Sequence, residues 1–124
     1  MNIPADLKYS KSHEWVKKTG EARAQIGLTD YAQNELGDIV FVNLPAVNDA
    51  LVLDESFADV ESVKAVSDIY GPLNGHVVAA NEALLDDPAL INQDCYGAWL
   101  IEAEVESYGE LMDATVYEEY IATL

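Results

Sequence analysis

One lysine, Lys64, stands apart from every other basic residue of this chain. The chain has six Lys and Arg residues, and the remaining ones all precede residue 24: Lys8, Lys11, Lys17, Lys18 and Arg23. Of the 23 acidic residues, only three precede residue 24: Asp6, Glu14 and Glu21. A single amine on an acidic body suits an enzyme that must attach a cofactor to one lysine alone. The alternative is an ordinary solvated lysine.

Other kinds of reactive site find little support in the sequence. There is no Gly-x-Gly-x-x-Gly motif or other phosphate-binding loop. The two histidines, His13 and His76, are poorly spaced with Cys95 for a zinc site. Ser62 lies near Lys64, as in a Ser–Lys hydrolase, but such an enzyme also needs an oxyanion hole. We therefore expect a non-catalytic protein without a metal site.

The composition limits the partners that the protein can have. A formal net charge of −17 disfavours nucleic acid and anionic membranes, because both attract clustered Lys and Arg. The same charge favours protein partners with basic docking patches. Half of the residues are hydrophobic, which supports a packed core, and 124 residues fit one domain over residues 1–124. We expect that domain to be a monomer.

The sequence also bears on location. The single cysteine, Cys95, excludes an internal disulfide and does not indicate a secreted scaffold. No apolar run approaches the ~20 residues that span a bilayer. The N-terminus lacks the basic start and apolar stretch of a signal peptide. The expected location is the bacterial cytoplasm, with a mature mitochondrial form as the alternative.

Short apolar segments separated by turn residues predict a mainly β protein. Strands are expected at residues 14–18, 22–28 and 39–44, in a block over residues 51–80, and at residues 98–105. Asn74-Gly75 predicts a hairpin turn inside that block. The expected architecture is a β sandwich or flattened barrel with a few short helices.

Capping residues indicate where those helices begin and end. Thr29 and Gly37 predict a helix over residues 30–36, since Thr accepts an early backbone N–H and Gly suits the stop. Asn81 predicts the cap of a second short helix. Two capping-box spacings predict a helical C-terminal segment over about residues 107–124; they are Ser107…Glu110 and Thr115…Glu118.

The residues around Lys64 carry a specific resemblance. The segment Glu61-Ser62-Val63-Lys64-Ala65 is similar to the lysine motif of the H proteins of the glycine cleavage system, which are small lipoylated carriers. The resemblance covers essentially the whole chain. Its other main segments are Leu7-Lys8-Tyr9, Ser12-His13-Glu14-Trp15-Val16, Ile26-Gly27-Leu28-Thr29-Asp30, Leu36-Gly37-Asp38-Ile39-Val40 and Tyr96-Gly97.

The resemblance implies a fold, a cofactor and a set of partners. The fold is the barrel-sandwich hybrid of lipoyl domains, with Lys64 in a β-hairpin around residues 59–70. Lys64 would carry lipoic acid in amide linkage, attached by a lipoyl ligase or transferase. The carrier would take the aminomethyl group of glycine from a pyridoxal-phosphate-dependent glycine decarboxylase to a tetrahydrofolate-dependent aminomethyltransferase. Dihydrolipoyl dehydrogenase would then reoxidise it.

The resemblance also implies roles for individual residues. Glu61, Ser62, Val63 and Ala65 would form the attachment motif with Lys64. Three polar residues would contact the loaded arm when it folds back onto the protein: Ser12, Glu14 and Asp68. The family usually has glycines where Asn48-Asp49 and Asp54-Glu55 stand here. Because Asn and Asp adopt left-handed turns more readily than most residues, the turns are expected to survive.

Alternative functions follow from the same lysine. An H-like relay protein, which hands lipoate to 2-oxoacid dehydrogenases, needs the same hairpin. A biotin carrier usually has methionines beside its lysine, where Val63 and Ala65 stand here. A lipoyl domain of a dehydrogenase acyltransferase usually has an Asp before the lysine and a catalytic domain after it. The glycine cleavage carrier is therefore the leading hypothesis.

Overall fold

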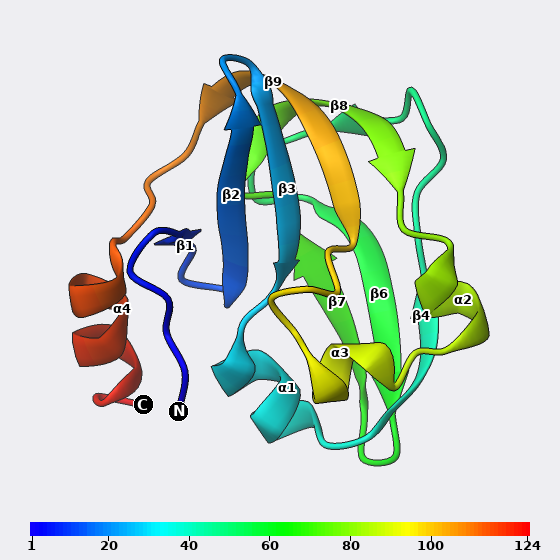
Figure 1. Ribbon diagram of the computed structural model, residues 1–124, viewed down its shortest axis with the longest axis vertical. Coiled ribbons are helices and arrows are strands. Elements are labelled where there is room, and N and C mark those ends of the chain that lie inside the picture. Colours follow the sequence, from blue (N-terminus) through cyan, green and yellow to red (C-terminus); the bar gives the residue numbers. More distant parts are fainter.

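Two antiparallel β-sheets form the body of the protein (Figure 1). The computed structural model describes residues 1–124. The larger sheet has the strand order β1-β2-β3-β9-β8-β5, with β1 at Lys8–Tyr9, β2 at Glu14–Gly20, β3 at Arg23–Leu28, β9 at Ile101–Tyr108, β8 at Leu73–Ala80 and β5 at Ala50–Leu51. The smaller sheet has the order β4-β6-β7, with β4 at Ile39–Asn43, β6 at Ser56–Ser62 and β7 at Val66–Tyr70.

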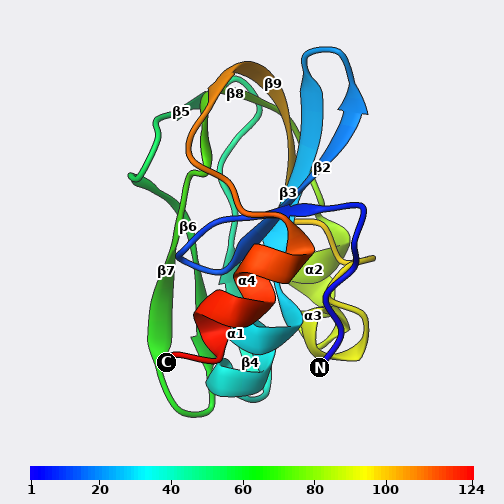
Figure 2. The same cartoon turned by 90° about the vertical axis from the view of Figure 1, so that its left-hand side faces the viewer.

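Four short helices cover the ends and sides of this sandwich. They are α1 (Asp30–Leu36), α2 (Ala83–Asp86), α3 (Leu90–Gln93) and α4 (Ala114–Ile121). Both chain termini lie toward the end of the molecule that carries α1 and α4, as the two perpendicular views show (Figure 1 and Figure 2). None of the helices is long and apolar enough to cross a membrane.

The core lies between the two sheets, where the inward-facing side chains meet. The smaller sheet contributes Val60 and Ile69, and the larger sheet contributes Ile26, Ile101 and Ala103, all of which are buried. Each fully buried Val or Ile side chain stabilises the fold by about 1.5–3 kcal/mol. The predicted β sandwich is thus confirmed, in a flattened form that does not close into a barrel.

Helix α1 forms where the sequence predicts it, because both of its ends are specified locally. The Thr29 hydroxyl accepts a hydrogen bond from the Ala32 backbone N–H at 3.2 Å. Gly37 ends the helix with a φ of 76°, a left-handed conformation that glycine adopts without steric cost. The Gly37 backbone N–H donates to the Gln33 carbonyl at 3.0 Å. This ending directs the chain from α1 into β4.

The predicted turn at Asn74-Gly75 is wrong. Both residues lie inside β8, at an irregularity in its pairing with β9. A Cβ at Gly75 would collide with the backbone oxygen of Glu104 on the neighbouring strand. The Asn74 side chain accepts a hydrogen bond from the Leu53 N–H at 2.9 Å. Close approach of two strands therefore explains this glycine, and a single sequence does not distinguish that constraint from a turn.

Two helix caps also differ from the prediction. Asn81 does not cap α2, because its side-chain amide donates to the Trp99 carbonyl at 2.9 Å and the residue before the helix, Glu82, makes no side-chain cap bond. The helical segment expected from residue 107 begins only at residue 114, since β9 extends to residue 108. Helix α4 is capped by Asp113, whose carboxylate accepts from the Val116 N–H at 2.9 Å.

The left-handed turns expected at the substituted glycines are present. Asn48 has a φ of 75° and Asp54 a φ of 66°. The Asn48 N–H donates to the Val77 carbonyl at 2.8 Å, and the Asp54 N–H donates to the Gly71 carbonyl at 2.9 Å. These hydrogen bonds offset part of the cost of a positive φ at a non-glycine residue.

A second, aromatic cluster attaches α4 to the larger sheet. Tyr9 and Tyr117 stack with ring centroids 4.7 Å apart and are fully buried. The buried ring of Trp15 completes the cluster, and its Nε1–H donates to the Cys95 carbonyl at 3.0 Å. This packing holds the start of β2, where His13 and Glu14 lie, in a fixed position beside α1 and α4.

Candidate functional site

Lys64 occupies a two-residue turn at the tip of the β6–β7 hairpin, which extends beyond the rest of the smaller sheet (Figure 1). Glu61 pairs with Val66, and the Ser62 N–H donates to the Ala65 carbonyl at 2.8 Å. Only Val63 and Lys64 remain between the two closing residues. The lysine side chain is therefore exposed at the end of the hairpin.

Ser62 stabilises this turn with its side chain. Its Oγ accepts hydrogen bonds from the backbone N–H groups of Lys64 and Ala65, each at 3.1 Å. A serine hydroxyl commonly satisfies turn amides in this way. The Ser62 side chain therefore fixes the backbone of the turn that presents Lys64.

The tip of the hairpin is also attached to the loop between α1 and β4. The Val63 N–H donates to the Asp38 carbonyl at 3.0 Å. Beside it, the Lys64 side chain passes over Gly37, where a Cβ would lie 3.4 Å from the lysine Cε. The left-handed end of α1 therefore accounts for Gly37, and the lysine stem passes close to it.

Asn92, at the third position of α3, fixes that loop from behind. Its Oδ1 accepts from the Ile39 N–H at 2.8 Å. Its Nδ2 donates to the Gly37 carbonyl at 2.9 Å and to the Gln33 side chain at 3.1 Å. No local sequence pattern indicates this role of Asn92, because its partners lie more than fifty residues away along the chain.

A small cavity of about 160 Å³ lies beside β7, close to the Lys64 hairpin. Its lining combines an apolar part with a polar part, and it includes all three residues expected to contact a loaded arm: Ser12, Glu14 and Asp68. The other lining residues are His13, Leu28, Tyr31, Ala32, Glu35, Leu36, Val60, Ser67 and Ile69. The fold therefore brings together two segments that are far apart in the sequence.

Glu14 is the most unusual residue of this cavity, because it is a carboxyl group that is only 1% exposed. Its Oε1 accepts hydrogen bonds from the hydroxyls of Ser12 at 2.6 Å and Ser10 at 2.8 Å. Burial raises the pKa of Glu14 to about 7, although the Ser12 and Ser10 hydroxyls favour the ionised form. A carboxyl group with this pKa can hold or release a proton near neutral pH.

Asp68 and Ser67 are placed differently from each other along the cavity wall. Ser67 pairs with the buried Val60, so it faces inward, whereas strand alternation directs Asp68 to the opposite face. The Asp68 carboxylate accepts a hydrogen bond from Ser56 Oγ at 3.4 Å on that outer face. Ser67 is therefore a cavity residue that the sequence did not indicate, and Asp68 lines the cavity from its edge.

His13 is the second residue that the sequence did not assign to this site. It has a φ of 73°, its Nδ1 lies 2.9 Å from the Tyr117 hydroxyl, and its ring lies 4.7 Å from that of Tyr31. Burial lowers the pKa of His13, and the nearby Glu35 carboxylate opposes that shift. The hydrogen bond to Tyr117 and the packing against Tyr31 hold this ring in place.

A larger hollow of about 800 Å³ lies at the other end of β7, next to Tyr70, Gly71 and Pro72. At roughly 3.4 Å per residue of strand, Tyr70 is about 20 Å from Lys64, whereas Ser67 is about 10 Å away. A flexible group attached to Lys64 therefore reaches the smaller cavity first.

Comparisons with known proteins agree with this arrangement. A family model described as "Glycine cleavage H-protein" matches residues 7–124. The glycine cleavage system H protein of Halothermothrix orenii is 52% identical over 121 residues, covering 97% of this chain and 94% of that protein. The H protein of Mycolicibacterium gilvum is 50% identical over 127 residues and covers 97% of each chain. This chain belongs to the glycine cleavage H-protein family.

A solved structure supports the same assignment. The chain is similar to the crystal structure of a glycine cleavage system H protein from Mycobacterium marinum, with a TM-score of 0.87 and 39% identity, and the match covers 98% of each chain. The resemblance to this family found from the sequence is thus confirmed. The family is one of lipoyl carriers, so an exposed lysine on a rigid turn is the feature that such a protein requires.

We expect Asn92→Ala to loosen the Lys64 turn. The substitution leaves the Ile39 N–H and the Gly37 carbonyl without their partner, which lowers the free energy of unfolding by about 1–3 kcal/mol. The substitution should also speed hydrogen exchange at the Val63 amide by more than the lower overall stability alone would explain. Gln93→Ala, at the exposed neighbouring position, is the control. An unchanged Val63 exchange rate, after correction for stability, would contradict this role.

We expect the buried Glu14 to make stability fall as pH rises. Because its pKa is raised from 4.5 to about 7, the folded protein binds more protons than the unfolded chain between these values. The protonated Glu14 contributes fully to the free energy of unfolding below about pH 4.5, and this contribution is lost as the pH rises through 7. Glu14→Gln has no titrating group at this position, so it lacks the effect. The free energy of unfolding of the variant, minus that of the wild type, should therefore rise by about 3 kcal/mol between pH 4.5 and 8. Urea unfolding of both proteins across this range measures it, and a pH-independent difference would show the account to be wrong.

Proposed function

We propose that this protein is the lipoylated carrier of a glycine cleavage system, with lipoic acid attached covalently to Lys64. The observation that carries the proposal is the position of Lys64. It is exposed on a two-residue turn, its stem passes over Gly37, and a cavity with a buried carboxyl group lies beside it. The matching family and the full-length relatives support the same function.

The residues present fit a lipoyl group. The amine of Lys64 takes part in neither of the two ion pairs of the structure, which are Arg23–Glu102 and His76–Glu104, so it is free for amide formation. The cavity beside the hairpin has an apolar wall suited to an aliphatic chain; it consists of Leu28, Ala32, Leu36, Val60 and Ile69. When bound, lipoic acid supplies a dithiolane that accepts and carries the aminomethyl group derived from glycine.

The polar end of the cavity suits a cationic amine. We propose that Glu14 binds such a group there, with Ser12 orienting the carboxylate through its 2.6 Å hydrogen bond and Asp68 contributing charge at the cavity edge. A cation close to Glu14 favours the ionised carboxylate and so lowers its pKa. The proton that Glu14 releases goes to solvent, and the resulting ion pair holds the amine away from bulk water.

The protein itself would catalyse no step. In this proposal its partners are a pyridoxal-phosphate-dependent glycine decarboxylase, a tetrahydrofolate-dependent aminomethyltransferase, dihydrolipoyl dehydrogenase and a lipoyl ligase or transferase. An arm tethered at Lys64 meets each of these enzymes at a high effective concentration once they dock. Bacterial relatives of this family favour a cytoplasmic setting for such a system.

Intact mass spectrometry after incubation with a lipoyl ligase, lipoic acid and ATP tests the attachment. We expect one lipoyl increment on the wild type and none on Lys64→Arg, which keeps the charge and the turn. The modified protein should then support glycine-dependent exchange of labelled carbon dioxide by a glycine decarboxylase.

The two readouts distinguish a wrong attachment site from a different function of the lipoylated protein. Absence of the increment on the wild type, or its presence on Lys64→Arg, would overturn the assignment of Lys64. Modification without exchange would favour the relay function, in which the protein hands lipoate to other enzymes.

A further inference from the structure

The outer face of the smaller sheet is uncovered. Figure 2 shows β6 and β7 at the edge of the molecule, with no helix or loop packed outside them. Strand pairing places Phe41, Glu61 and Val66 in one row across this face, and Asn43, Asp59 and Asp68 in the next. Between these two rows lies a row of inward-facing side chains, in which Val42 and Val60 are buried and Ser67 is half-buried.

Exposed apolar side chains surround Glu61 near the hairpin tip: Phe41 and Val66 flank it in its row, and Val63 lies in the turn. Val66 is 69% exposed, Val63 67% and Phe41 52%. Val40, at the irregularity in β4, is also exposed next to Phe41. An apolar patch of this kind beside a functional residue typically marks an interaction site.

The second row places two carboxylates opposite each other with no basic side chain paired to either of them. Asp59 and Asp68 are directly opposite each other on neighbouring strands, and like charges in this arrangement destabilise a sheet. Neither carboxylate belongs to one of the two ion pairs of the structure. A partner that places Lys or Arg side chains against this pair would remove the repulsion.

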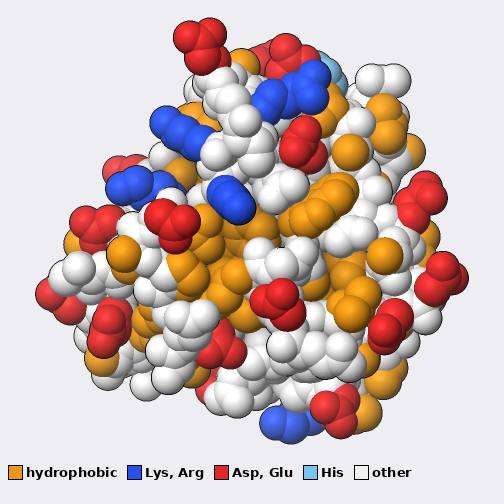
Figure 3. Space-filling view, in the orientation of Figure 1, with side chains coloured by type: hydrophobic (Ala, Val, Ile, Leu, Met, Phe, Trp, Pro, Cys, Tyr) orange, Lys and Arg blue, Asp and Glu red, His pale blue; other side chains and the backbone are white.

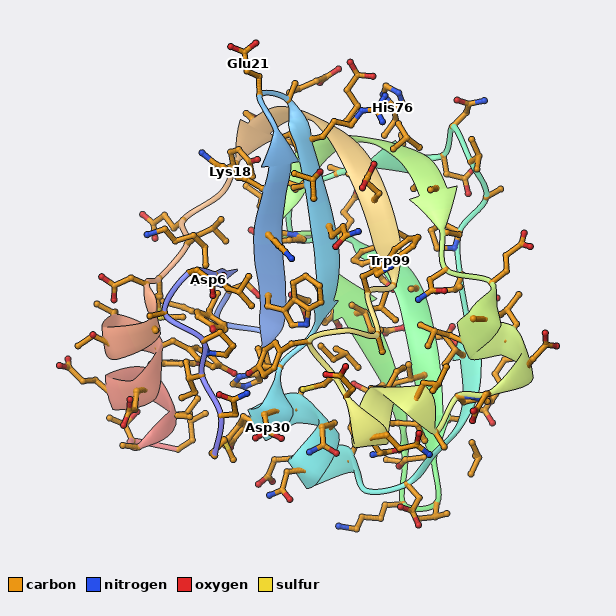
Figure 4. All side chains as sticks on the ribbon, in the orientation of Figure 1. Asp6, Lys18, Glu21, Asp30, His76 and Trp99 are labelled. Atoms are coloured by element: carbon orange, nitrogen blue, oxygen red, sulfur yellow. The ribbon has the colours of Figure 1, made fainter.

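The other lysines have different surroundings. Four of them lie at the N-terminal end of the chain, in or beside β1 and β2: Lys8, Lys11, Lys17 and Lys18. Figure 4 shows Lys18 at the end of the molecule opposite the β6–β7 turn, and Figure 3 shows most of the basic side chains gathered on that side. Lys64 alone combines a hairpin tip, the exposed apolar side chains and the carboxylate pair.

We propose that this outer face is the docking surface for the enzyme that attaches lipoate to Lys64. That enzyme would cover Phe41, Val63 and Val66 with an apolar patch and place basic side chains against Asp59 and Asp68. The inference rests on the proposed function, because it names how one partner of that function recognises its lysine. It also explains how one lysine of several is selected, since docking on this face brings only Lys64 to the active site.

Charge argues against a second copy of the chain as the occupant. Two such faces in contact would bring six carboxylates together, those of Asp59, Glu61 and Asp68 from each copy, on molecules that each carry a formal charge of −17. Opposite charge on the partner, by contrast, accelerates association and fixes the docking orientation. The surface therefore fits a protein with a basic rim around an apolar contact.

Steady-state lipoylation by the ligase, followed by intact mass, tests the surface with two variants. Val66→Ser should raise KM by roughly 5-fold or more while kcat stays close to wild type, as for a truncated contact at an interface. Val47→Ser, which is also exposed but lies outside the hairpin, is its control. The Val66 side chain projects outward, so the core is unaffected.

Asp59→Asn separates docking from stability. Removal of one like charge should leave the urea midpoint unchanged or raise it, while KM rises several-fold and depends less on salt. Glu106→Gln, an exposed carboxylate on β9, is its control. If Val66→Ser and Asp59→Asn both keep the wild-type KM, the docking surface is refuted. If the wild type itself takes up no lipoate, the proposed function fails instead.

Discussion

The hydrogen bond from the Val63 N–H to the Asp38 carbonyl is the contact on which the site depends. A two-stranded hairpin is only marginally stable alone. Here β4 pairs with β6 as far as Ile39 and Ser62, but the turn beyond Ser62 lies outside that pairing. This bond attaches the tip to the α1–β4 loop. Asn92 fixes that loop through the Gly37 carbonyl. The backbone of the tip is thereby held in place while the Lys64 side chain stays exposed, as the proposed swinging arm requires.

The second constraint is electrostatic. A protein with a net charge of −17 has many carboxylates, yet only Glu14 is almost completely buried. The Ser10 and Ser12 hydroxyls keep the carboxyl group oriented, and burial keeps its pKa close to neutral pH. The site is thus prepared for a positive charge without requiring one for folding. The buried carboxylate and the cation would stabilise each other, because each offsets the desolvation of the other.

The sequence predicted the features that depend on neighbouring residues. The Thr29 cap and the left-handed turns at Asn48 and Asp54 follow from local chemistry and were confirmed. The family that the residues around Lys64 resemble was confirmed by the family model, whereas the role of Lys64 itself stays a proposal. The failures involve contacts between distant segments. Gly75 is required by an adjacent strand rather than by a turn, so the Asn-Gly signal was misleading.

The same reason explains the site residues that the sequence missed. Ser67 faces the cavity only because β7 pairs with β6 in one register, and a shift of one residue would exchange it with Asp68. Asn92 reaches the α1–β4 loop across more than fifty residues of sequence. His13 joins the cavity because α4 packs over it. None of these placements has a local signature.

In the proposed function, the cavity beside Lys64 holds the cationic end of the loaded arm against Glu14. The most direct measurement is the pKa of Glu14, followed by ¹³C NMR of its carboxyl carbon, in the unmodified protein and in the lipoylated protein loaded with the aminomethyl group. We expect a pKa of about 7 before modification and a clearly lower value after loading, since a nearby cation favours the carboxylate. An identical pKa in both forms would mean that the amine does not reach Glu14.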